Sequence, residues 1–437
     1  MTTRIFAPNR REVLAGLGAS VGASATGLIA AGAGPRVTAQ LALQARAATL
    51  ALRPGQPPTP IWELAAVSHL SDVRLKRFDS CQLVFRNDLP VPLAPVWYGL
   101  SAPTVTDQFR GRAPVAPDAT ETSMVSIPNA GTLLADFRLF EDDQKQPARA
   151  LPIIAAESSR VAVDRDVVVL IEEWRLGPDG TALPPGRDPK DTTALYTVNG
   201  KASFELSASV GERLRLRFIN GSQRSVLAIK LENHEVQVMA LDGQPAEPFP
   251  ARNGALVLAP GARADAFVDA ITSAPFLLHD GKEARQIGSL TISGRLERPP
   301  LLPPQPLPPN DLPEKLDLKG ALRFDVALGG AEAGWMRPAN FSAASAPTFR
   351  AKPGRTVVLA LKNPAPATAV FHLHGHHFRL LDKLDDGWKP YWLDTLAIEP
   401  GQTQRIAFAA TSPGRWLLES VITDWAAPRL VRWYGVE

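Results

Sequence analysis

The feature that most constrains the fold is a strand pattern that occurs three times at intervals of about 140 residues. Gly211 opens the segment Gly-Glu-Arg-Leu-Arg-Leu-Arg-Phe-Ile-Asn, and Gly354 opens Gly-Arg-Thr-Val-Val-Leu-Ala-Leu-Lys-Asn. Residues 81–87, Cys-Gln-Leu-Val-Phe-Arg-Asn, form a weaker copy in which Phe78 takes the place of the glycine. In the first segment apolar residues alternate with arginines, which predicts a strand with one apolar and one charged face.

A turn recurs at the same interval. Pro117-Asp118, Pro260-Gly261 and Pro400-Gly401 each precede another alternating run. Repetition at this length indicates duplicated domains, because solenoid repeats are shorter. Proline, at 41 of 437 residues, works against long helices and favours short strands joined by turns. We therefore predict an all-β protein of three Greek-key β-sandwich domains, at 48–158, 159–297 and 316–437, with a stiff proline-rich linker at 298–315.

Residues 1–39 have the composition of an export signal. Arg10-Arg11 is followed by a stretch rich in Ala, Gly, Leu, Val and Ser, and small residues at 37–39 and 45–47 offer two cleavage sites. The arginine pair resembles the signal of the twin-arginine pathway, which carries folded proteins across the bacterial inner membrane. A plain secretory signal or an uncleaved anchor is the alternative, but the stretch is only weakly apolar for a permanent span. We predict export to the periplasm and no membrane span after cleavage.

Charge and cysteine content exclude several classes of function. The formal net charge of +3 is carried by residues 1–39, with four arginines and one glutamate, so the rest of the chain is close to neutral. A neutral body gives no reason to expect nucleic acid or an anionic membrane as a partner. Cys81 is the only cysteine, which excludes an intramolecular disulfide and a multi-cysteine metal site.

Four of the seven histidines lie within residues 371–378, Phe-His-Leu-His-Gly-His-His-Phe. On a strand, His372, His374 and His376 would share one face, because side chains alternate from face to face. Imidazoles are common ligands of transition metals. The cluster therefore indicates either a metal site or a polar strand end.

This histidine segment resembles the third domain of the multicopper oxidases. Other landmarks of that family are similar to the segments 164–174, 198–201, 211–220, 260–265 and 394–401 of this chain. The resemblance covers nearly all of the chain after the signal and implies three cupredoxin-like domains. In the family, a blue type 1 copper is held by one cysteine and two histidines. A three-copper cluster is held by eight histidines in His-x-His pairs.

The resemblance also indicates which residues occupy the ligand positions in this chain. Only His372 and His374 match cluster ligands. The remaining ligand positions that we can align hold other residues, namely Val96, Tyr98, Asp136, Arg138, Ala369, Glu419, Ser420, Val421, Trp425 and Leu430. Among these, Ser420 takes the place of the type 1 cysteine and Leu430 that of the axial methionine. The internal repeat gives the same register, since Val96 follows Asn87 by nine residues as His372 follows Asn363.

A blue copper site requires a thiolate, so we expect no catalytic residues and no bound cofactor of the family's kind. The first-domain positions Tyr98, Asp136 and Arg138 are expected to face the histidine pair across the junction of domains one and three. There, Arg138 would pair with Asp136 or Glu419, and the histidines would be hydrogen-bonded within that network. Alternatively, His372 and His374 with a carboxylate hold a single transition metal, such as Fe, Mn, Zn or a residual copper.

Three hypotheses about function follow. The leading one is a non-catalytic periplasmic protein that binds envelope or cell-division partners, similar to the copper-free, twin-arginine-exported member of this family that associates with the division machinery. The second is a copper-dependent oxidoreductase of the family. The third is a single-metal protein that uses His372 and His374.

Overall fold

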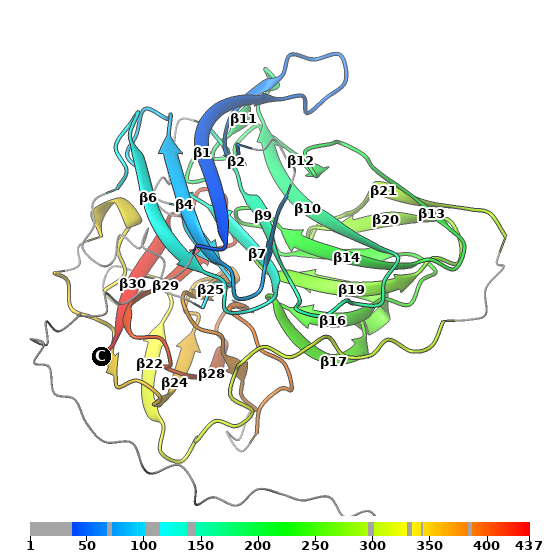
Figure 1. Cartoon of the computed structure of the whole chain (residues 1–437). Coiled ribbons are helices and arrows are strands. Elements are labelled where there is room, and N and C mark those ends of the chain that lie inside the picture. The colour runs from blue at the N-terminus through cyan, green and yellow to red at the C-terminus, as the bar shows by residue number, and fades with distance from the viewer. Residues whose placement is uncertain are drawn as a thin grey trace, which may run out of the picture. The chain divides into compact units, whose positions relative to one another are not determined.

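The computed structural model describes residues 37–67, 72–93, 95–101, 114–137, 146–295, 301–329, 334–341, 344–382 and 387–437. The arginine pair of the predicted signal and the predicted site residue Arg138 lie outside these ranges. Within them, regular structure consists of strands and two short 3-10 turns, Arg252–Gly254 and Pro338–Asn340, which confirms the all-β prediction (Figure 1). None of these residues belongs to a helix that is long and apolar enough to cross a membrane.

The first sandwich pairs a five-stranded with a four-stranded sheet. The larger sheet has the order β6–β4–β1–β2–β8. Its strands are β1 (Ala39–Leu50), β2 (Thr59–Ala66), β4 (Ser80–Asn87), β6 (Thr120–Ser126) and β8 (Ala148–Arg149). The smaller sheet, β3–β9–β7–β5, consists of β3 (Val73–Lys76), β5 (Val96–Tyr98), β7 (Gly131–Asp136) and β9 (Leu151–Ala156). Leu43 and Phe85 of one sheet and Ile153 of the other belong to one buried core.

The middle sandwich contains a seven-stranded and a five-stranded sheet. The larger one has the order β11–β10–β14–β19–β16–β17, with β12 also paired to β10. Its strands are β10 (Arg165–Leu176), β11 (Ala182–Leu183), β12 (Thr193–Val198), β14 (Arg213–Asn220), β16 (Gln237–Leu241), β17 (Gln244–Pro250) and β19 (Arg263–Asp269). The smaller sheet, β13–β21–β20–β15–β18, consists of β13 (Phe204–Ser209), β15 (Leu227–Leu231), β18 (Ala255–Leu258), β20 (Ala274–His279) and β21 (Ala284–Ser293).

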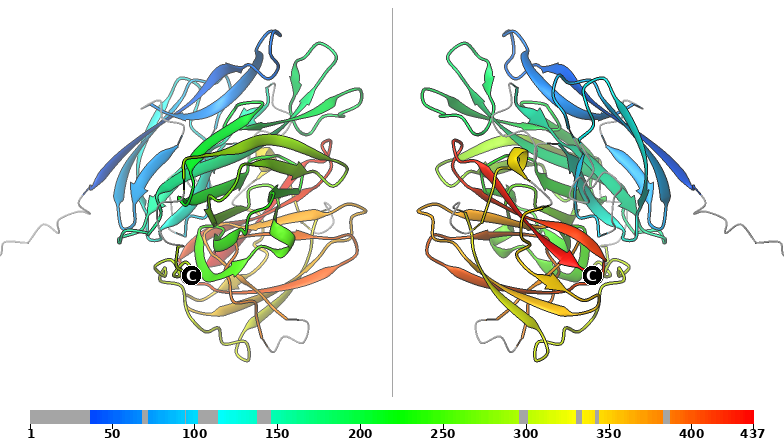
Figure 2. Two further views of the ribbon diagram at one scale, coloured as in Figure 1. Left: turned by 90° about the vertical axis from the view of Figure 1, so that its right-hand side faces the viewer. Right: turned by 90° about the vertical axis from the view of Figure 1, so that its left-hand side faces the viewer.

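The third sandwich contains a four-stranded and a five-stranded sheet, drawn from yellow to red in Figures 1 and 2. The sheet β22–β24–β28–β26 consists of β22 (Leu322–Ala327), β24 (Thr356–Lys362), β26 (Arg379–Leu380) and β28 (Thr403–Ala409). The sheet β23–β30–β29–β25–β27 consists of β23 (Arg350–Ala351), β25 (Ala369–Leu373), β27 (Thr395–Ile398), β29 (Gly414–Ile422) and β30 (Arg429–Val436). Figure 2 shows these sheets from two further sides.

The internal repeat of the sequence is a repeat of hydrogen bonds. Asn87, Asn220 and Asn363 each donate two hydrogen bonds of 2.7–2.9 Å from the side-chain amide to backbone carbonyls of their own sandwich. The backbone carbonyl of each asparagine accepts a hydrogen bond from the backbone N–H of the residue after the repeated proline. In the middle sandwich, the Gly261 N–H donates to the Asn220 carbonyl at 2.8 Å. The asparagine therefore fastens the end of a central strand to the repeated turn, which explains the fixed spacing between the two.

Backbone conformation explains the repeated glycine. Gly211 and Gly354 both have φ of 82°, and Phe78 has φ of 69° at the same place in the first sandwich. Glycine adopts this left-handed conformation without the steric cost that a Cβ imposes. Two of the three copies therefore have glycine at this turn, and the third, with Phe78, bears the steric cost of a Cβ in this conformation.

The first sandwich begins upstream of the boundary predicted at residue 48. Strand β1 starts at Ala39 and lies in the middle of its sheet, paired with β2 and β4. Leu41, Leu43 and Ala45 alternate with more exposed residues and are at most 5% exposed. The small side chains that suggest a cleavage site at 45–47 thus belong to a core strand.

The proline-rich linker packs against the body of the protein. Leu307 is 5% exposed and lies in a buried cluster with Met239 and Phe267 of the middle sandwich. Asn310 bonds both the N–H and the carbonyl of Ala130 in the first sandwich, at 2.9 and 2.8 Å. The described part of the linker is therefore held in place by two domains.

The arginine face of β14 is buried between the first two sandwiches. Arg217 makes a bidentate ion pair with Asp166 and a bond of 2.8 Å to Asp265, and the Thr132 hydroxyl of the first sandwich donates to the same Asp265 at 2.6 Å. Arg215 pairs with Asp265 and with Glu157. Buried charges persist when they are paired and hydrogen-bonded in this way. The charged face predicted for this strand is thus a domain interface.

Arg263 connects all three sandwiches. It is 0% exposed, and its Nε donates to the Thr132 carbonyl of the first sandwich at 3.2 Å. Its two terminal nitrogens bind the carboxylate of Asp394 in the third sandwich at 3.0 and 2.6 Å. They also donate to the carbonyls of Gly261 and Asp242 in the middle sandwich, both at 2.9 Å. All five N–H groups of the guanidinium therefore have acceptors.

The position of β1 predicts where the chain can be shortened. A chain that starts at Ala48 lacks a central strand and three core side chains, so its first sandwich should be strongly destabilised, by at least the roughly 2–5 kcal/mol typical of one large core deletion. A chain that starts at Val37 should keep full stability. Thermal unfolding of the two chains tests this, and equal midpoints would contradict the prediction.

Candidate functional site

The candidate site lies where β5 of the first sandwich meets β25 and β29 of the third. His372 on β25 stands opposite Glu419 on β29, and Val96 on β5 stands opposite Asp136 on β7. The two strand pairs are therefore equivalent in their domains, as the internal repeat predicts. Tyr98, two residues beyond Val96, corresponds in the same way to His374. The structure brings Tyr98, His374 and Glu419 together.

Glu419 is the centre of this site and is fully buried. Its Oε2 accepts hydrogen bonds from the Tyr98 hydroxyl at 3.2 Å and from His374 Nε2 at 3.0 Å. Its Oε1 is paired with Arg429 on the neighbouring strand β30. Arg429 also donates to Gln223 of the middle sandwich at 3.0 Å. The carboxylate is thus bonded from the first and third sandwiches, and through Arg429 it is linked to the middle one.

The charges around Glu419 keep it ionised. Burial alone raises the pKa of a carboxyl group, but the Arg429 guanidinium, and after it His372 and His374, more than offset that effect. The pKa of Glu419 therefore lies well below its ordinary value. The site contains a permanent, buried glutamate–arginine ion pair.

His372 is buried beside this pair and is neutral. The Thr395 hydroxyl donates to Asp394 at 2.7 Å, so it accepts a bond from His372 Nδ1 at 2.8 Å. Burial lowers the pKa of His372 to about 4, in part offset by Glu419. Gly261 of the middle sandwich approaches so closely that a Cβ there would lie 2.9 Å from the ring. All three sandwiches therefore border the histidine pair.

His376 does not share a face with His372 and His374, as it would on a continuous strand. Strand β25 ends at Leu373, and Gly375 has φ of 79° with Trp416 packed where a side chain would be. The chain turns there, and His376 enters the core of the third sandwich. Its Nδ1 bonds the Tyr434 hydroxyl at 2.7 Å, and its Nε2 accepts from the Ser412 N–H at 3.2 Å. Burial lowers the pKa of His376 to about 3.

His377 is also a buried structural residue. It contacts the Ser101 hydroxyl through Nδ1 at 3.2 Å and the Asp242 carbonyl through Nε2 at 3.1 Å. Burial is the main reason that its pKa is lowered. His376 and His377 therefore support the fold and do not border Glu419.

The positions that correspond to the family's type 1 copper ligands are filled with side chains packed into the protein. Ala369 and Ser420 are at most 1% exposed. The neighbouring Val421, which the resemblance aligns with a ligand of the three-copper cluster, packs into the core of the middle sandwich. Trp425 donates from its indole to the Pro184 carbonyl at 3.1 Å, and its own carbonyl accepts from Gly186 at 2.8 Å. Leu430 packs against the core of the third sandwich.

Cys81 lies in a different domain from these positions. It is 0% exposed on β4 in the core of the first sandwich. Burial, and after it the charge of Asp79, raises the pKa of the thiol to about 11. The thiol is therefore protonated and enclosed by apolar side chains, as the sequence predicted for a small buried residue.

Sequence reasoning paired Arg138, which lies outside the described residues, with either Asp136 or Glu419, and it missed Arg429. The pairing of strands 414–422 and 429–436 would have indicated this partner, because Val421 stands opposite Arg429 in that hairpin. Glu419 shares a face with Val421, since side chains alternate. Glu419 and Arg429 are thus diagonal neighbours. Asp136 is buried at the end of β7.

No three histidine, cysteine, aspartate or glutamate side chains in the described ranges gather where they could hold a metal ion. The chemistry of the site is therefore that of an ion pair with two imidazoles and a phenol. Such a group can fix the mutual positions of domains and hold hydrogen bonds.

The chain matches two family models that are both described as multicopper oxidase. One covers residues 166–286 and the other 315–437, together more than half of the chain. The protein therefore belongs to the multicopper oxidase family, and its three sandwiches are cupredoxin-like domains. Copper is the cofactor of that family.

Individual relatives agree with this assignment. Multicopper oxidase MmcO of Mycobacterium tuberculosis is 23% identical over 393 residues, which cover 76% of this chain and 74% of the relative. Copper resistance protein A of Escherichia coli is 22% identical over 232 residues, 40% of this chain and 38% of the relative.

Solved structures show the same fold. A multi-copper oxidase from Pseudomonas Thermotolerans superposes with a TM-score of 0.76 at 22% identity, covering 92% of this chain and 100% of that one. Lac15 from a marine microbial metagenome superposes with a TM-score of 0.73 at 25% identity, covering 91% of this chain and 100% of its own.

The Glu419–Arg429 pair predicts a large effect of removing one charge. Glu419→Gln keeps the shape but leaves the Arg429 cation buried without its counter-ion, which should lower the free energy of unfolding by about 3–5 kcal/mol. Chemical denaturation measures this. Arg429→Met combined with Glu419→Gln should recover part of the loss, because no lone charge remains. A double variant that is less stable than Glu419→Gln would contradict the prediction.

His376 predicts a pH dependence of stability. Its pKa of about 3 in the folded protein lies below the ordinary value of 6.5, so the unfolded chain binds a proton first as the pH falls. The stabilisation is complete above pH 6.5 and is lost on the way down to pH 3. His376→Asn should therefore flatten the slope of unfolding free energy between pH 6 and 5 by about 1 kcal/mol per pH unit. Denaturation series at both pH values measure it, and an unchanged slope would contradict it.

Proposed function

We propose that this chain is a non-catalytic, exported member of the multicopper oxidase family that acts by binding other proteins of the cell envelope. The observation that carries the proposal is the buried Glu419–Arg429 ion pair, which occupies the region where the family's resemblance places cluster ligands. A guanidinium at that point repels a metal cation. The pair also links the domains, which suits a rigid binding protein.

The donor chemistry at the copper positions supports this proposal. A blue copper needs a thiolate, and the aligned positions carry Ala369, Ser420, Trp425 and Leu430, none of which supplies a thiolate or an imidazole. Cys81, the only thiol, is protonated in the core of another domain. The two remaining imidazoles fall short of the eight that hold three coppers. The residues present therefore do not fit the family's copper centres, and no electron-transfer step is assigned to them.

A second candidate function is the binding of one metal ion at His372. The bond from Nδ1 to Thr395, which itself bonds Asp394, leaves Nε2 as the lone-pair nitrogen. Metal-binding histidines are commonly oriented by such a bond. His374, however, has its Nε2 engaged with Glu419, and Arg429 lies on the far side of that carboxylate. The geometry favours the ion pair over a metal ion.

Export is the remaining part of the proposal. The arginine pair at residues 10–11 and the stretch that follows support transport by the twin-arginine pathway to the periplasm. Transport in the folded state suits a body whose three domains share buried ion pairs, because those pairs form only when the domains are assembled. Association with the division or envelope-maintenance apparatus rests on the resemblance alone.

The experiment is a deletion strain with three complementing genes. We expect poor division or leakage under envelope stress and unchanged copper tolerance, because the copper positions carry no suitable donors. The wild-type gene and His372→Ala combined with His374→Ala should both rescue. Arg10→Lys combined with Arg11→Lys should not, because its product stays in the cytoplasm. Growth, microscopy and fractionation measure these outcomes.

Purified protein provides the biochemical half of the same experiment. After loading with copper it should show no intense blue absorption and no oxygen consumption with phenols. A copper-sensitive deletion strain, or a folded and exported double-histidine variant that fails to rescue, would favour a metal-dependent function. A stoichiometric metal that is lost in the His372→Ala variant would identify the single-metal candidate.

A further inference from the structure

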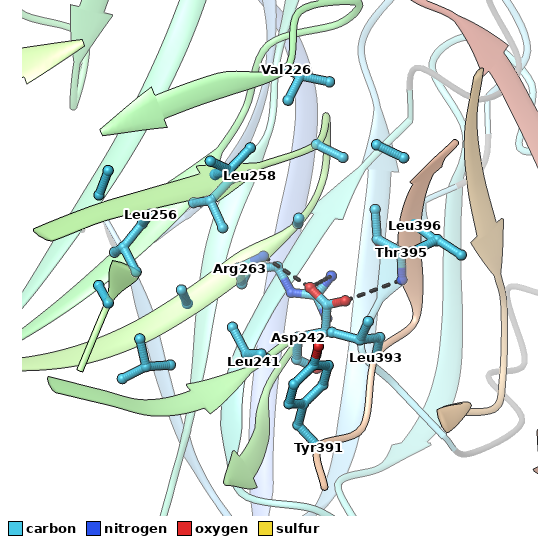
Figure 3. Close-up of a pocket in the computed structure, with 18 of the residues that line it drawn as sticks. Val226, Leu241, Asp242, Leu256, Leu258, Arg263, Tyr391, Leu393, Thr395 and Leu396 are labelled. Carbon is cyan, nitrogen blue, oxygen red and sulfur yellow. Dashed lines mark hydrogen bonds and ion pairs between the residues drawn. The ribbon is translucent and has the colours of Figure 1, made fainter. Parts of the chain in front are cut away.

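An apolar groove lies between the middle and third sandwiches. It has a volume of about 380 Å³. One wall comes from the middle sandwich, with Leu241, Leu256 and Leu258, and the other comes from the third, with Leu393 and Leu396 (Figure 3). This groove continues the apolar contact between the two sandwiches, in which Val370 and Val421 of the third pack into the core of the middle one.

Two edge strands border the groove. Strand β18 is the last strand of the sheet β13–β21–β20–β15–β18, and β27 is the last strand of β23–β30–β29–β25–β27. Within the described residues, each pairs with a strand on one side only, β18 with β15 and β27 with β25. The Thr395 N–H at the start of β27 already donates to Asp242 at 3.1 Å, and the Leu258 carbonyl at the end of β18 accepts from Asn220 at 2.8 Å. The rest of the outer edge of β18 can accept another strand. Natural proteins usually place charged residues or proline on such edges to prevent pairing with other chains. Strand β18 has neither, because its sequence is Ala-Leu-Val-Leu.

The side chains of β18 alternate as a peptide-binding edge requires. Leu256 and Leu258 line the groove and belong to the buried core of the middle sandwich, whereas Val257 between them also lines the groove and is 67% exposed. Opposite them, Tyr391 and Phe249 stack at 6.3 Å between ring centroids and form one end of the groove. The groove is thus shaped for apolar side chains that enter at every second position of a strand.

One charged residue at this groove, Arg252, has no ion-pair partner among the described residues. Arg252 lines it and is exposed, and no ion pair to Arg252 occurs in the described part of the chain. The other charged residues of the lining, Asp242 and Arg263, are buried and bonded at its floor. An occupant with an acidic residue beside Arg252 would complement this charge.

We propose that the groove binds an extended segment of another envelope protein, which adds as a strand to the edge of β18, inserts apolar side chains at alternate positions and places an acidic side chain against Arg252. In this mode the main-chain hydrogen bonds supply affinity, and the groove supplies specificity. The inference rests on the proposed function, because it names where the partner of a binding protein would attach.

The experiment starts from a phage-displayed library of random decapeptides selected on the purified full-length chain. Enriched sequences should carry apolar residues at two alternate positions and an aspartate or glutamate nearby. The most enriched peptide is then synthesised with a fluorescent label, and its affinity is measured by anisotropy. Replacing a central residue of that peptide by proline should abolish binding, because proline cannot donate to the edge strand.

Three variants of the protein locate the site. Arg252→Glu reverses an exposed charge without disturbing the core and should weaken binding by about tenfold or more. Ala397→Trp fills the groove from β27 and should abolish binding. Arg295→Glu is the matched control and should bind as the wild type does, because Arg295 lies two residues beyond β21, which is three strands away from β18 in the same sheet.

Several results would overturn the inference. These are the absence of any enriched family of peptides, full binding to Arg252→Glu and Ala397→Trp, and tolerance of proline. A small aromatic probe such as indole that stabilises the wild type but not Ala397→Trp, without any peptide selected, would assign the groove to a small molecule instead.

The deletion strain separates this inference from the proposed function. If Arg252→Glu and Ala397→Trp restore division and envelope integrity fully, the groove is not the docking site, although the binding function still stands. If the deletion strain is copper-sensitive, the proposed function itself fails, whatever the groove binds.

Discussion

The structure depends on one buried arginine that three domains share. Arg263 has five N–H groups, and the acceptors for them come from Thr132, Gly261, Asp242 and Asp394, which lie in three different sandwiches. Removing a buried charge from its partners costs several kcal/mol, so none of these domains can move away alone without leaving a charge unpaired. The bonds from Arg217 and Thr132 to Asp265 join the first two sandwiches in the same way, by pairing buried charges across the interface. The three domains therefore behave as one body, and the candidate site is built where they meet.

The candidate site follows the same principle. Where the family's resemblance places metal ligands, this chain has a glutamate bonded by a tyrosine, a histidine and an arginine. A metal ion joins the domains of an oxidase through its ligands; here a carboxylate of strongly lowered pKa joins them through hydrogen bonds. The chain has the fold of the family, and the hydrogen bonds and the ion pair of Glu419 hold the domains together at their junction. The function that we propose uses the surface of this rigid body, at the groove between β18 and β27.

The predictions about the repeat and the candidate site show why sequence patterns identify some features and miss others. The repeat of Asn87, Asn220 and Asn363 fixed the register, because each asparagine makes the same local hydrogen bonds in its own sandwich. His376 does not follow the alternation of His372 and His374, because β25 ends at Leu373 and Gly375 turns the chain in a left-handed conformation. Arg429 was not predicted as the partner of Glu419, because the prediction considered only the family's ligand positions and not the strand pairing within the hairpin.

The sequence by itself determined the all-β class and the three equivalent sandwiches, because these depend on alternation and spacing along the chain. Only the tertiary structure decided what the charged residues do. Arg215, Arg217 and Arg263 alternate or stand alone in the sequence as solvent-facing residues would, yet each is at most 1% exposed. Their partners come from other strands and other domains, and a pattern along one strand carries no information about which domain will cover it. The same holds for β1, whose small residues resemble a cleavage site until β2 and β4 are seen on either side of it.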